Sequence, residues 1–506
     1  MSIQRSLEQL AKMIDEADFL LNEQLANDAL ARADELESKL ESTQFVEFYY
    51  FKANAWSSLR RIKHQDESRI WGWQQEEILH EIYYLRCAIT HSAFETTDDF
   101  RKCQILVNTG NILNHIGRPI EAIEYWRRAL TIIPSFAMAK VNLALGWEVY
   151  GKLLYDRRHS CLLLNQAYKM YSSLKTGRLI WDSEDFKQIF STVIEHENQI
   201  RLHVDVEKID SIPLDGYSLG RSKVERIYRV WVLENTLFLN PLNDIGAHSI
   251  ASTDILHLPS LVTDQYMVPH HYGFFNQLKQ EFASARYQLW QSISECDLCK
   301  KHVSDKDVYL VDTLDFSRYG MAIEQVKLAF RSSYSLLDKV AYFINDYWDL
   351  GLPKRQITFS KVWYKNAKKI DGIHLQLENL ENNCLRGLYW LSKDFVDEGN
   401  EGELLLGKVM EPDATKLAGL RNHLEHKYVK VHDEFFFDRD LSGGNFFDDE
   451  LALHISTEEL IAKSIKLLKL IRASLVYLSL AVHREEQVKA SKKPNFKMPV
   501  IMTPIK

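Results

Sequence analysis

Apolar residues recur at intervals of three and four along most of the chain, the spacing that places them on one face of an α-helix. The pattern is plainest beyond residue 320. One helix is predicted from about Met321 to Trp348, and its apolar face is formed by Phe330, Tyr334, Leu337, Ala341, Ile344 and Trp348. A shorter helix is marked by Leu385, Leu388 and Leu391.

Two more helices of this kind follow. The first has Pro412 in its first turn, where proline is tolerated, and an apolar face formed by Leu417, Leu420, Leu424, Tyr428 and Val431. Ser456 and Glu459 form a capping box at the start of the second, whose apolar face comprises Ile461, Ile465, Leu468, Ile471, Leu475, Leu478 and Val482. Four such helices predict a helical bundle.

The N-terminal half contains one internal repeat. Asn108 and Gly117 recur as Asn142 and Gly151, in each case 34 positions further on. The small, large and helix-ending residues between them are Ala122, Tyr125, Ala129, Leu130 and Pro134. This unit resembles a tetratricopeptide repeat, in which stacked helix pairs form a solenoid. Apolar spacing predicts further helix pairs before and after it.

These patterns predict an all-α chain with four regions. Residues 1–205 are predicted to form a helical-repeat solenoid, and residues 206–320 a connecting, mostly helical or irregular region that packs on the bundle. Residues 321–487 are predicted to form the bundle, and residues 488–506 a tail. The concave face of such a solenoid usually binds a protein or peptide, so a trigger or inhibitor is expected there.

Composition, net charge and cysteine content indicate the class of protein and its expected compartment. Of the 506 residues 46% are apolar and 26% charged, as in a folded chain, and the net charge of −8 provides no global attraction for RNA. The six cysteines are sparse and no apolar signal segment begins the chain, which favours the reducing cytoplasm. The longest apolar run, 473–482, is far shorter than the roughly 18 residues of a membrane span, so no membrane contact is expected.

A polar string on the third bundle helix carries the candidate chemistry: Arg421, Asn422, His423, Glu425 and His426. An arginine offers a cationic fork to a phosphate, and a histidine can exchange protons with a ribose hydroxyl near neutral pH. RNA cleavage with these groups needs no metal or other cofactor. Arg421 and His426 are separated by about 140° around the helix axis, so two copies facing each other across a twofold axis would complete one site more easily than one copy.

A set of ordered segments from about residue 225 to about residue 487 resembles the LA2681-like branch of the HEPN superfamily of helical ribonuclease domains. They read VLENTLFLNPLND, GFFNQLKQEF, KLAFRSSYSLLDKVAYFINDYW, LRGLYWLSKDF, GLRNHLEHKYVKVHDE and IRASLVYLSLAVH. The resemblance implies a homodimeric, metal-independent endoribonuclease of the kind often used in bacterial toxin and antiviral systems. Its products would carry a 2',3'-cyclic phosphate and a free 5'-hydroxyl.

The resemblance also implies roles for single residues. Arg421 would bind and polarise the scissile phosphate of an RNA substrate, and His426 would act on the 2'-hydroxyl or the leaving oxygen. Asn422 would orient the phosphate or the histidine. Glu425 and His423 are secondary candidates without an assigned role.

A second function remains open, in which the chain is a non-catalytic dimeric scaffold that binds protein or RNA. Arg421 and Glu425 would then form an ordinary surface pair one helical turn apart.

Two other groups of residues contain side chains that are able to bind a metal ion. Cys296, Cys299 and His302 have a spacing compatible with zinc, but no second ligand pair follows, and two free thiols are favoured. His270 and His271 are interpreted as solvated residues of a loop. No metal site is predicted.

Overall fold

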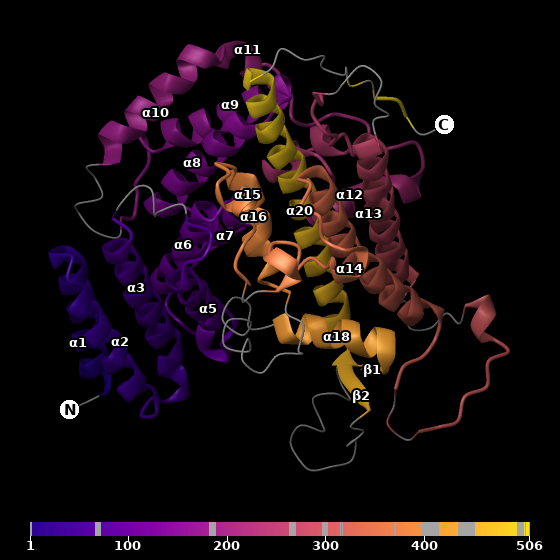
Figure 1. Ribbon diagram of the computed structural model, residues 1–506, viewed down its shortest axis with the longest axis horizontal. Helices are drawn as coiled ribbons and strands as arrows, with labels where there is room; N and C mark the ends of the chain where they lie inside the picture. The colour runs from indigo at the N-terminus through magenta and orange to yellow at the C-terminus, as the bar shows by residue number, and fades with distance from the viewer. Residues whose placement is uncertain are drawn as a thin grey trace. The chain divides into compact units, whose positions relative to one another are not determined.

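The computed structural model describes residues 3–65, 72–181, 189–262, 270–295, 302–313, 315, 317–368, 371–395, 414–433, 451–492, 500 and 502–504. The chain forms two compact units, coloured by residue number in Figure 1. The first unit comprises Met1–Ile212 and Glu378–Thr415, and the second comprises Pro213–Leu377 and Lys416–Lys506. Helices dominate both units, which confirms the predicted all-α class. No helix within these described ranges combines the length and apolar character needed to cross a membrane.

The first unit is an array of helices in which each helix up to α10 packs against the next along the chain, whereas α11 packs against α9. Its helices are α1 (Ile3–Leu20), α2 (Glu23–Glu37), α3 (Phe45–Lys63), α5 (Glu76–Thr90), α6 (Asp99–His115), α7 (Pro119–Ile132), α8 (Ala137–Leu153), α9 (Arg157–Ser173), α10 (Ile189–His203) and α11 (Val206–Asp210). This run of neighbours is the helical solenoid that the apolar spacing predicted.

The predicted repeat centres on the packing of Trp126. This residue of α7 is 2% exposed, and its indole donates to the side-chain oxygen of Asn111 at 3.1 Å. A Cβ atom on Gly110 of α6 or on Gly146 of α8 would approach the indole to 2.4 Å. Both neighbouring helices therefore need a residue without a side chain at these positions, which were not among the residues that identified the repeat.

The helix α16 (Asn383–Ser392) belongs to the first unit, although its spacing had assigned it to the C-terminal bundle. It follows α15 (Leu375–Glu378), where the chain leaves the second unit. Gly387 of α16 meets Gly117, in the turn between α6 and α7, so closely that a Cβ on Gly387 would lie 2.0 Å from the carbonyl oxygen of Gly117. Apolar spacing predicted the helix but does not specify which partner covers it.

A buried ion cluster fixes the end of this segment. Asp394 is 1% exposed and accepts from Arg86 at 2.7 Å and from Arg118 at 2.6 Å. Arg118 also donates to Glu121 at 2.8 Å. Two cations and two carboxylates compensate one another within the array, and the cluster binds the inserted segment to α5 and to the start of α7.

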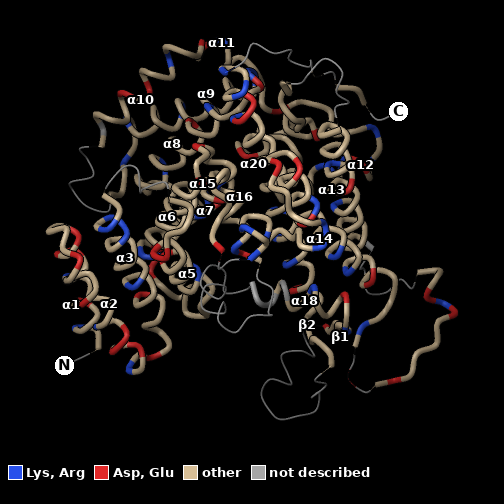
Figure 2. Tube along the Cα trace, in the orientation of Figure 1, with Lys and Arg blue, Asp and Glu red and all other residues tan. Residues whose placement is uncertain are grey.

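The second unit is built around α20 (Thr457–Lys492), which packs against both α13 (His270–Glu295) and α14 (Met321–Tyr347). From Leu470 to Val482 every residue of α20 is buried, as expected for a helix surrounded by others. Ser456 caps its start, because the Ser456 hydroxyl accepts from the backbone of Glu459 at 3.1 Å, which is one of the two bonds of the predicted capping box. The helix ends at Lys492, five residues beyond the end expected for the bundle. Acidic and basic residues are interspersed along the helices (Figure 2).

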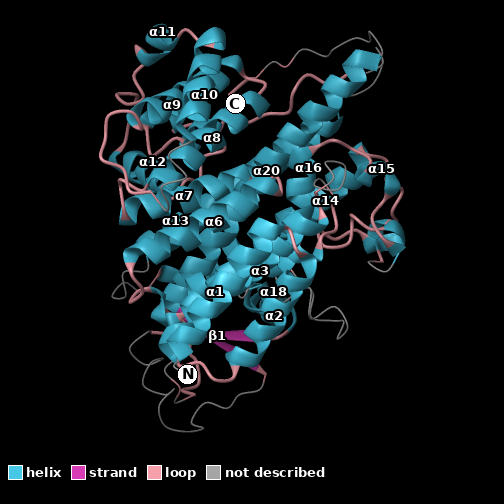
Figure 3. Cartoon of the chain, turned by 90° about the vertical axis from the view of Figure 1, so that its left-hand side faces the viewer, coloured by secondary structure: helices cyan, strands magenta, loops and turns pink. Residues whose placement is uncertain are grey.

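The helix that carries the polar string, α18 (Ala414–His426), is shorter than predicted. The chain continues as β1 (Tyr428–His432), which pairs in parallel with β2 (Ala452–Ser456), the strands seen in Figure 3. Tyr428 and Val431 therefore lie on a strand and not on the helix face to which they were assigned. Valine and tyrosine suit a strand as well as a helix, and the pairing with β2 decides between the two. Pro412 lies outside the described residues.

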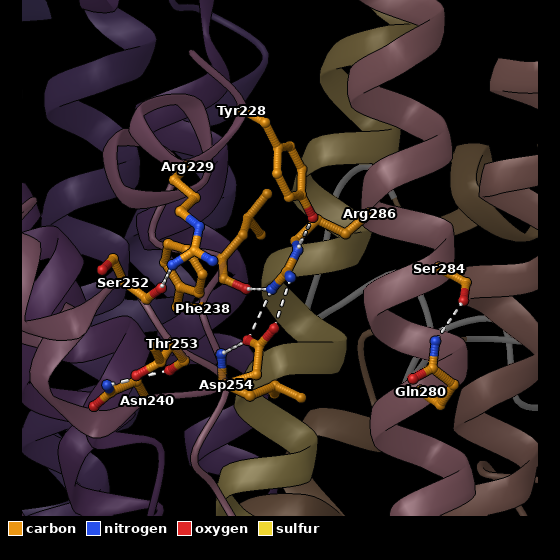
Figure 4. Close-up of polar contacts among 12 residues, drawn as sticks. Tyr228, Arg229, Phe238, Asn240, Ser252, Thr253, Asp254, Gln280, Ser284 and Arg286 are labelled. Atoms are coloured by element: carbon orange, nitrogen blue, oxygen red, sulfur yellow. Dashed lines mark hydrogen bonds and ion pairs between the residues drawn. The ribbon is translucent and has the colours of Figure 1, made fainter. Parts of the chain in front are cut away.

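Two buried arginines attach the segment from Leu237 to Leu256 to the helices of the second unit. Arg286 of α13 donates to both carboxylate oxygens of Asp254, at 2.9 and 2.7 Å, and to the Tyr228 hydroxyl of α12 (Lys223–Glu234) at 2.9 Å (Figure 4). Arg472 of α20 binds Asp244 in the same bidentate way, at 2.7 and 3.0 Å. The segment is thus part of the core of this unit.

Candidate functional site

Two leucines fix the orientation of α18. Leu417 and Leu420 are completely buried, whereas Leu424 in the last full turn is half-buried. This leaves the polar string on the sides of the helix and at its C-terminal end. The string is therefore held by a short apolar contact and retains access to solvent.

Arg421 lies against α14. Its guanidinium is 5.0 Å from the ring centre of Tyr334, and one of its nitrogens is 3.9 Å from a carboxylate oxygen of Asp338. The Arg421 side chain is 33% exposed. A distance of 3.9 Å is at the outer limit of an ion pair, so the contact with Asp338 is weak. The ring of Tyr334 supports the flat cation from one side, which orients its donors.

Asp338 is itself held in place from a second direction. Its other carboxylate oxygen accepts from the backbone of Phe359 at 3.1 Å. The carboxylate thus has one oxygen bound to the loop after α14 and one oxygen toward Arg421. This arrangement positions the guanidinium without a tight salt bridge to it.

Glu425 pairs with another arginine of α14. Arg331 donates to its two carboxylate oxygens at 3.2 and 3.3 Å. Arg421 and Glu425, four residues apart on α18, therefore both face α14. The scaffold interpretation expected a pair between Arg421 and Glu425, whereas Glu425 has its partner on the other helix.

The remaining members of the string lie on other sides of α18. The ring of His423 bonds through Nδ1 to the carbonyl oxygen of Gly419, one turn earlier, at 2.7 Å. Asn422 is half-buried and His426 is exposed at the last residue of the helix. The helix therefore separates His426 from Arg421 around its axis, as the spacing predicted, and the structure does not bring these two side chains together within one chain.

Three residues near the string were not among the predicted site residues: Arg331, Tyr334 and Asp338. They follow one another at intervals of three and four on α14, so they lie along one side of that helix. Tyr334 was assigned to the apolar core, and it is indeed 7% exposed. In the sequence, this surface was indicated only by the spacing of Arg331 and Asp338 beside a core position. That spacing does not show which helix packs against the surface.

The two paired strands beyond α18 carry a pair of stacked histidines, one on each strand. His432 of β1 and His454 of β2 have ring centres 5.1 Å apart, and their nitrogens are 2.9 Å apart. Burial lowers the pKa of His432, and the neighbouring His454 lowers it further. His432 is therefore neutral near pH 7 and does not supply a positive charge for a phosphate.

A buried ion pair stabilises the same strand. Lys430 lies 2.8 Å from Asp315. Burial raises the pKa of Asp315, but the bonds from Lys430, Thr313 and Ser317 outweigh it and hold this pKa far below its usual range. Asp315 is thus ionised at neutral pH and anchors the strand that begins two residues after His426.

The cysteines of the possible zinc motif, Cys296 and Cys299, lie outside the described residues. His302 is described, and its Nδ1 lies 2.7 Å from the Ser304 hydroxyl. His270 and His271 are the first two residues of α13 and not part of a loop.

Comparison with known families supports the resemblance in the second unit. Residues 262–485 match the model of the LA2681-like HEPN family. This match supports the HEPN superfamily for that part of the chain, and no tetratricopeptide family model matches the N-terminal array. No curated protein and no solved structure matches the chain. The matched range begins after Leu237–Leu256, which the structure nevertheless places in the same unit.

Proposed function

We infer that the part of the chain similar to LA2681-like HEPN domains is a metal-independent endoribonuclease, with Arg421, Asn422 and His426 as its active-site residues. One observation carries the proposal: within the matched range, α18 presents a half-buried arginine and an exposed histidine on one short helix. The contacts of Arg421 with Tyr334 and Asp338 support it, because they orient the guanidinium while leaving it accessible.

The chemistry needs one proton acceptor, one proton donor and one cation. A base removes the proton of the ribose 2'-hydroxyl, and the 2'-oxygen attacks the adjacent phosphorus. The bond to the 5'-oxygen breaks, and that oxygen takes up a proton. The products are a 2',3'-cyclic phosphate and a 5'-hydroxyl. Arg421 stabilises the charge that builds up on the phosphate. His426 either accepts the proton of the 2'-hydroxyl or donates a proton to the leaving 5'-oxygen.

The proposed active form is a homodimer. Arg421 and His426 point away from each other on one helix, whereas a second copy related by a twofold axis brings the histidine of one chain toward the arginine of the other. The exposed position of His426 at the end of α18 is compatible with such an arrangement.

Control of the activity is assigned to the N-terminal array. The chain passes from the second unit into the first near residue 377 and returns near residue 415, at the start of α18. A protein or peptide bound to the array acts on a unit that contains the segment preceding the active-site helix. A ribonuclease restrained in this way suits a toxin or an antiviral effector, which must be inactive in a healthy cell.

A second function, a dimeric scaffold without catalysis, is favoured by the pairing of Arg331 with Glu425. These contacts join α18 to α14 and would suffice for a purely structural helix. The scaffold and the enzyme predict the same fold and differ only in what happens to bound RNA.

The test is incubation of the purified full-length chain with total RNA in the presence of a chelator, followed by mapping of the fragment ends. The His426→Ala variant is compared with His248→Ala, which removes an exposed histidine that pairs with Asp215 elsewhere in the second unit. Fragments with cyclic phosphate ends are expected from the native protein and from His248→Ala, and not from His426→Ala.

Cleavage that survives loss of His426 would reject the assigned active site. An RNA complex that forms without cleavage, even after dimerisation is verified and cell extract is added as a source of trigger, would favour the scaffold. Circular dichroism of each variant excludes misfolding as the cause.

A further inference from the structure

Two histidines and one aspartate converge where α13 begins and α14 ends. They are His270, His271 and Asp346, and their ligand atoms all lie within 4.8 Å of one another. In the described part of the chain no other cluster of three such residues meets this condition. We propose that this cluster binds one divalent transition-metal ion of the zinc type, independently of the proposed RNA cleavage.

The distances from the two histidines to the carboxylate of Asp346 fit a single ion. Nε2 of His270 is 3.2 Å from Oδ2 of Asp346, and Nε2 of His271 is 3.0 Å from the same oxygen. Metal–ligand bonds of about 2.0–2.1 Å place neighbouring ligands about 2.9 Å apart in octahedral and about 3.3 Å apart in tetrahedral coordination. Both separations lie in this interval.

The surroundings of the His271 Nε2 atom provide a second observation. Its Nε2 atom is buried and forms no aligned hydrogen bond within the described residues, although the Asp346 oxygen is only 3.0 Å away. A buried ring nitrogen without such a bond is unfavourable. A metal ion between the nitrogen and the carboxylate would satisfy both.

The surroundings hold the His271 ring in place. It packs against Phe343 and Tyr347 of α14, with ring centres 5.2 and 5.3 Å apart. Tyr347 in turn donates to Glu486 of α20, and Lys489 lies near its ring. One ligand is therefore fixed by aromatic packing, whereas the side chains of His270 and Asp346 are 55% and 59% exposed, which gives an ion access from solvent.

The electrostatic setting is balanced. Histidines in the first turn of α13 meet the positive end of that helix, which disfavours a cation. Asp346 lies in the last turn of α14, where the negative end of the helix and the carboxylate both favour a cation. Three protein ligands also leave coordination positions open for water or for another ligand.

The site is separate from the proposed ribonuclease residues. Asp346 lies eight residues after Asp338, which is about 12 Å along α14. An ion at this position joins α13 to α14 and does not reach the guanidinium of Arg421. Its expected effect is on the stability of the helix pair, and the proposal stands if RNA is never cleaved.

Binding of zinc ions alone to the metal-free, full-length protein tests the site by isothermal titration calorimetry. Because free cysteine thiols can also bind added zinc, Cys296→Ser/Cys299→Ser serves as the background for all samples. In this background, one zinc ion per chain is expected to bind and to raise the melting temperature. His271→Ala and Asp346→Asn are each expected to weaken this binding by about tenfold or more.

The matched control is His248→Ala. His248 and Asp215 form an exposed pair at 2.8 Å without a second histidine, so its loss should leave zinc binding unchanged. Cobalt provides a second readout, because the visible absorption of bound cobalt should disappear in His271→Ala. Zinc binding that is absent in the background protein, or equal in His271→Ala, would overturn the proposal.

Discussion

Asp394 accepts a hydrogen bond of 2.6 Å from Arg118, a residue 276 positions earlier in the chain. Both side chains are buried, and Arg86 binds the same carboxylate from α5. This relationship explains why a segment flanked in sequence by helices of the second unit folds with the first. It also makes Asp394 the residue whose loss should release that segment.

Asp394→Ala is expected to lower the free energy of unfolding of the first unit by about 3–5 kcal/mol, because it leaves two buried arginines without their shared carboxylate. Chemical denaturation followed by circular dichroism measures the change. Glu35→Ala is the control: it removes an exposed partner of Arg32 and should cost no more than about 1 kcal/mol. Equal losses in the two variants would show that the cluster contributes little.

The same cluster should make stability depend on acid pH. Burial raises the pKa of Asp394, but Arg118 and Arg86 outweigh it and lower this pKa to about 2. The unfolded carboxyl titrates near about pH 4, so the contribution is complete above that pH and is lost as pH falls from about 4 toward 2. Melting temperatures between pH 2 and 6 should fall less steeply in Asp394→Asn, which starts from a lower value.

Gly387→Ala should displace α16 from the array. Its Cβ atom would lie 2.0 Å from the carbonyl oxygen of Gly117, a backbone atom that cannot rotate away. A loss of roughly 1–3 kcal/mol is expected, with faster proteolysis of the segment. Gly177→Ala is the control, since its Cβ would meet only an ordinary contact at 3.8 Å. Resistance to protease equal to that of the native chain would contradict the prediction.

Arg472→Met should destabilise the second unit by about 3–5 kcal/mol, because the buried carboxylate of Asp244 loses the positive charge that lies 2.7 Å from it. Replacing that aspartate as well, in Arg472→Met/Asp244→Leu, should restore part of the loss. Complete restoration is not expected, since Arg472 also donates to the carbonyl oxygens of Phe238 and Asn240. Denaturant titration of the single and double variants measures the coupling between the two residues.

The two histidines of α18 should differ in their effect on RNA cleavage. Loss of a proton-transferring histidine typically lowers the rate by about 10²–10⁴-fold, and this is expected for His426→Ala. His423→Ala should have a much smaller effect, because its ring is bonded to the carbonyl oxygen of its own helix. Cleavage rates measured under single-turnover conditions compare the two. The reverse order would move the assignment to His423.

The sequence by itself determined most of the helices, the helical array of the N-terminal half and the position of the polar string, because these depend on spacing within ten to thirty-five residues. It indicated α14 and α20 with small errors at their ends, and the opposite orientation of Arg421 and His426 followed from helix geometry alone.

Only the tertiary structure decided which elements are partners. The apolar face of α16 is equally suited to either unit, and the choice rests on Gly117, Arg86 and Arg118, which lie far away in sequence. The contacts of Arg421 with Tyr334 and Asp338, and the meeting of His271 with Asp346, depend in the same way on how separate helices pack. Helical spacing specifies one face of one helix, whereas a site needs two faces, and their pairing is set by packing and charge compensation across the whole fold.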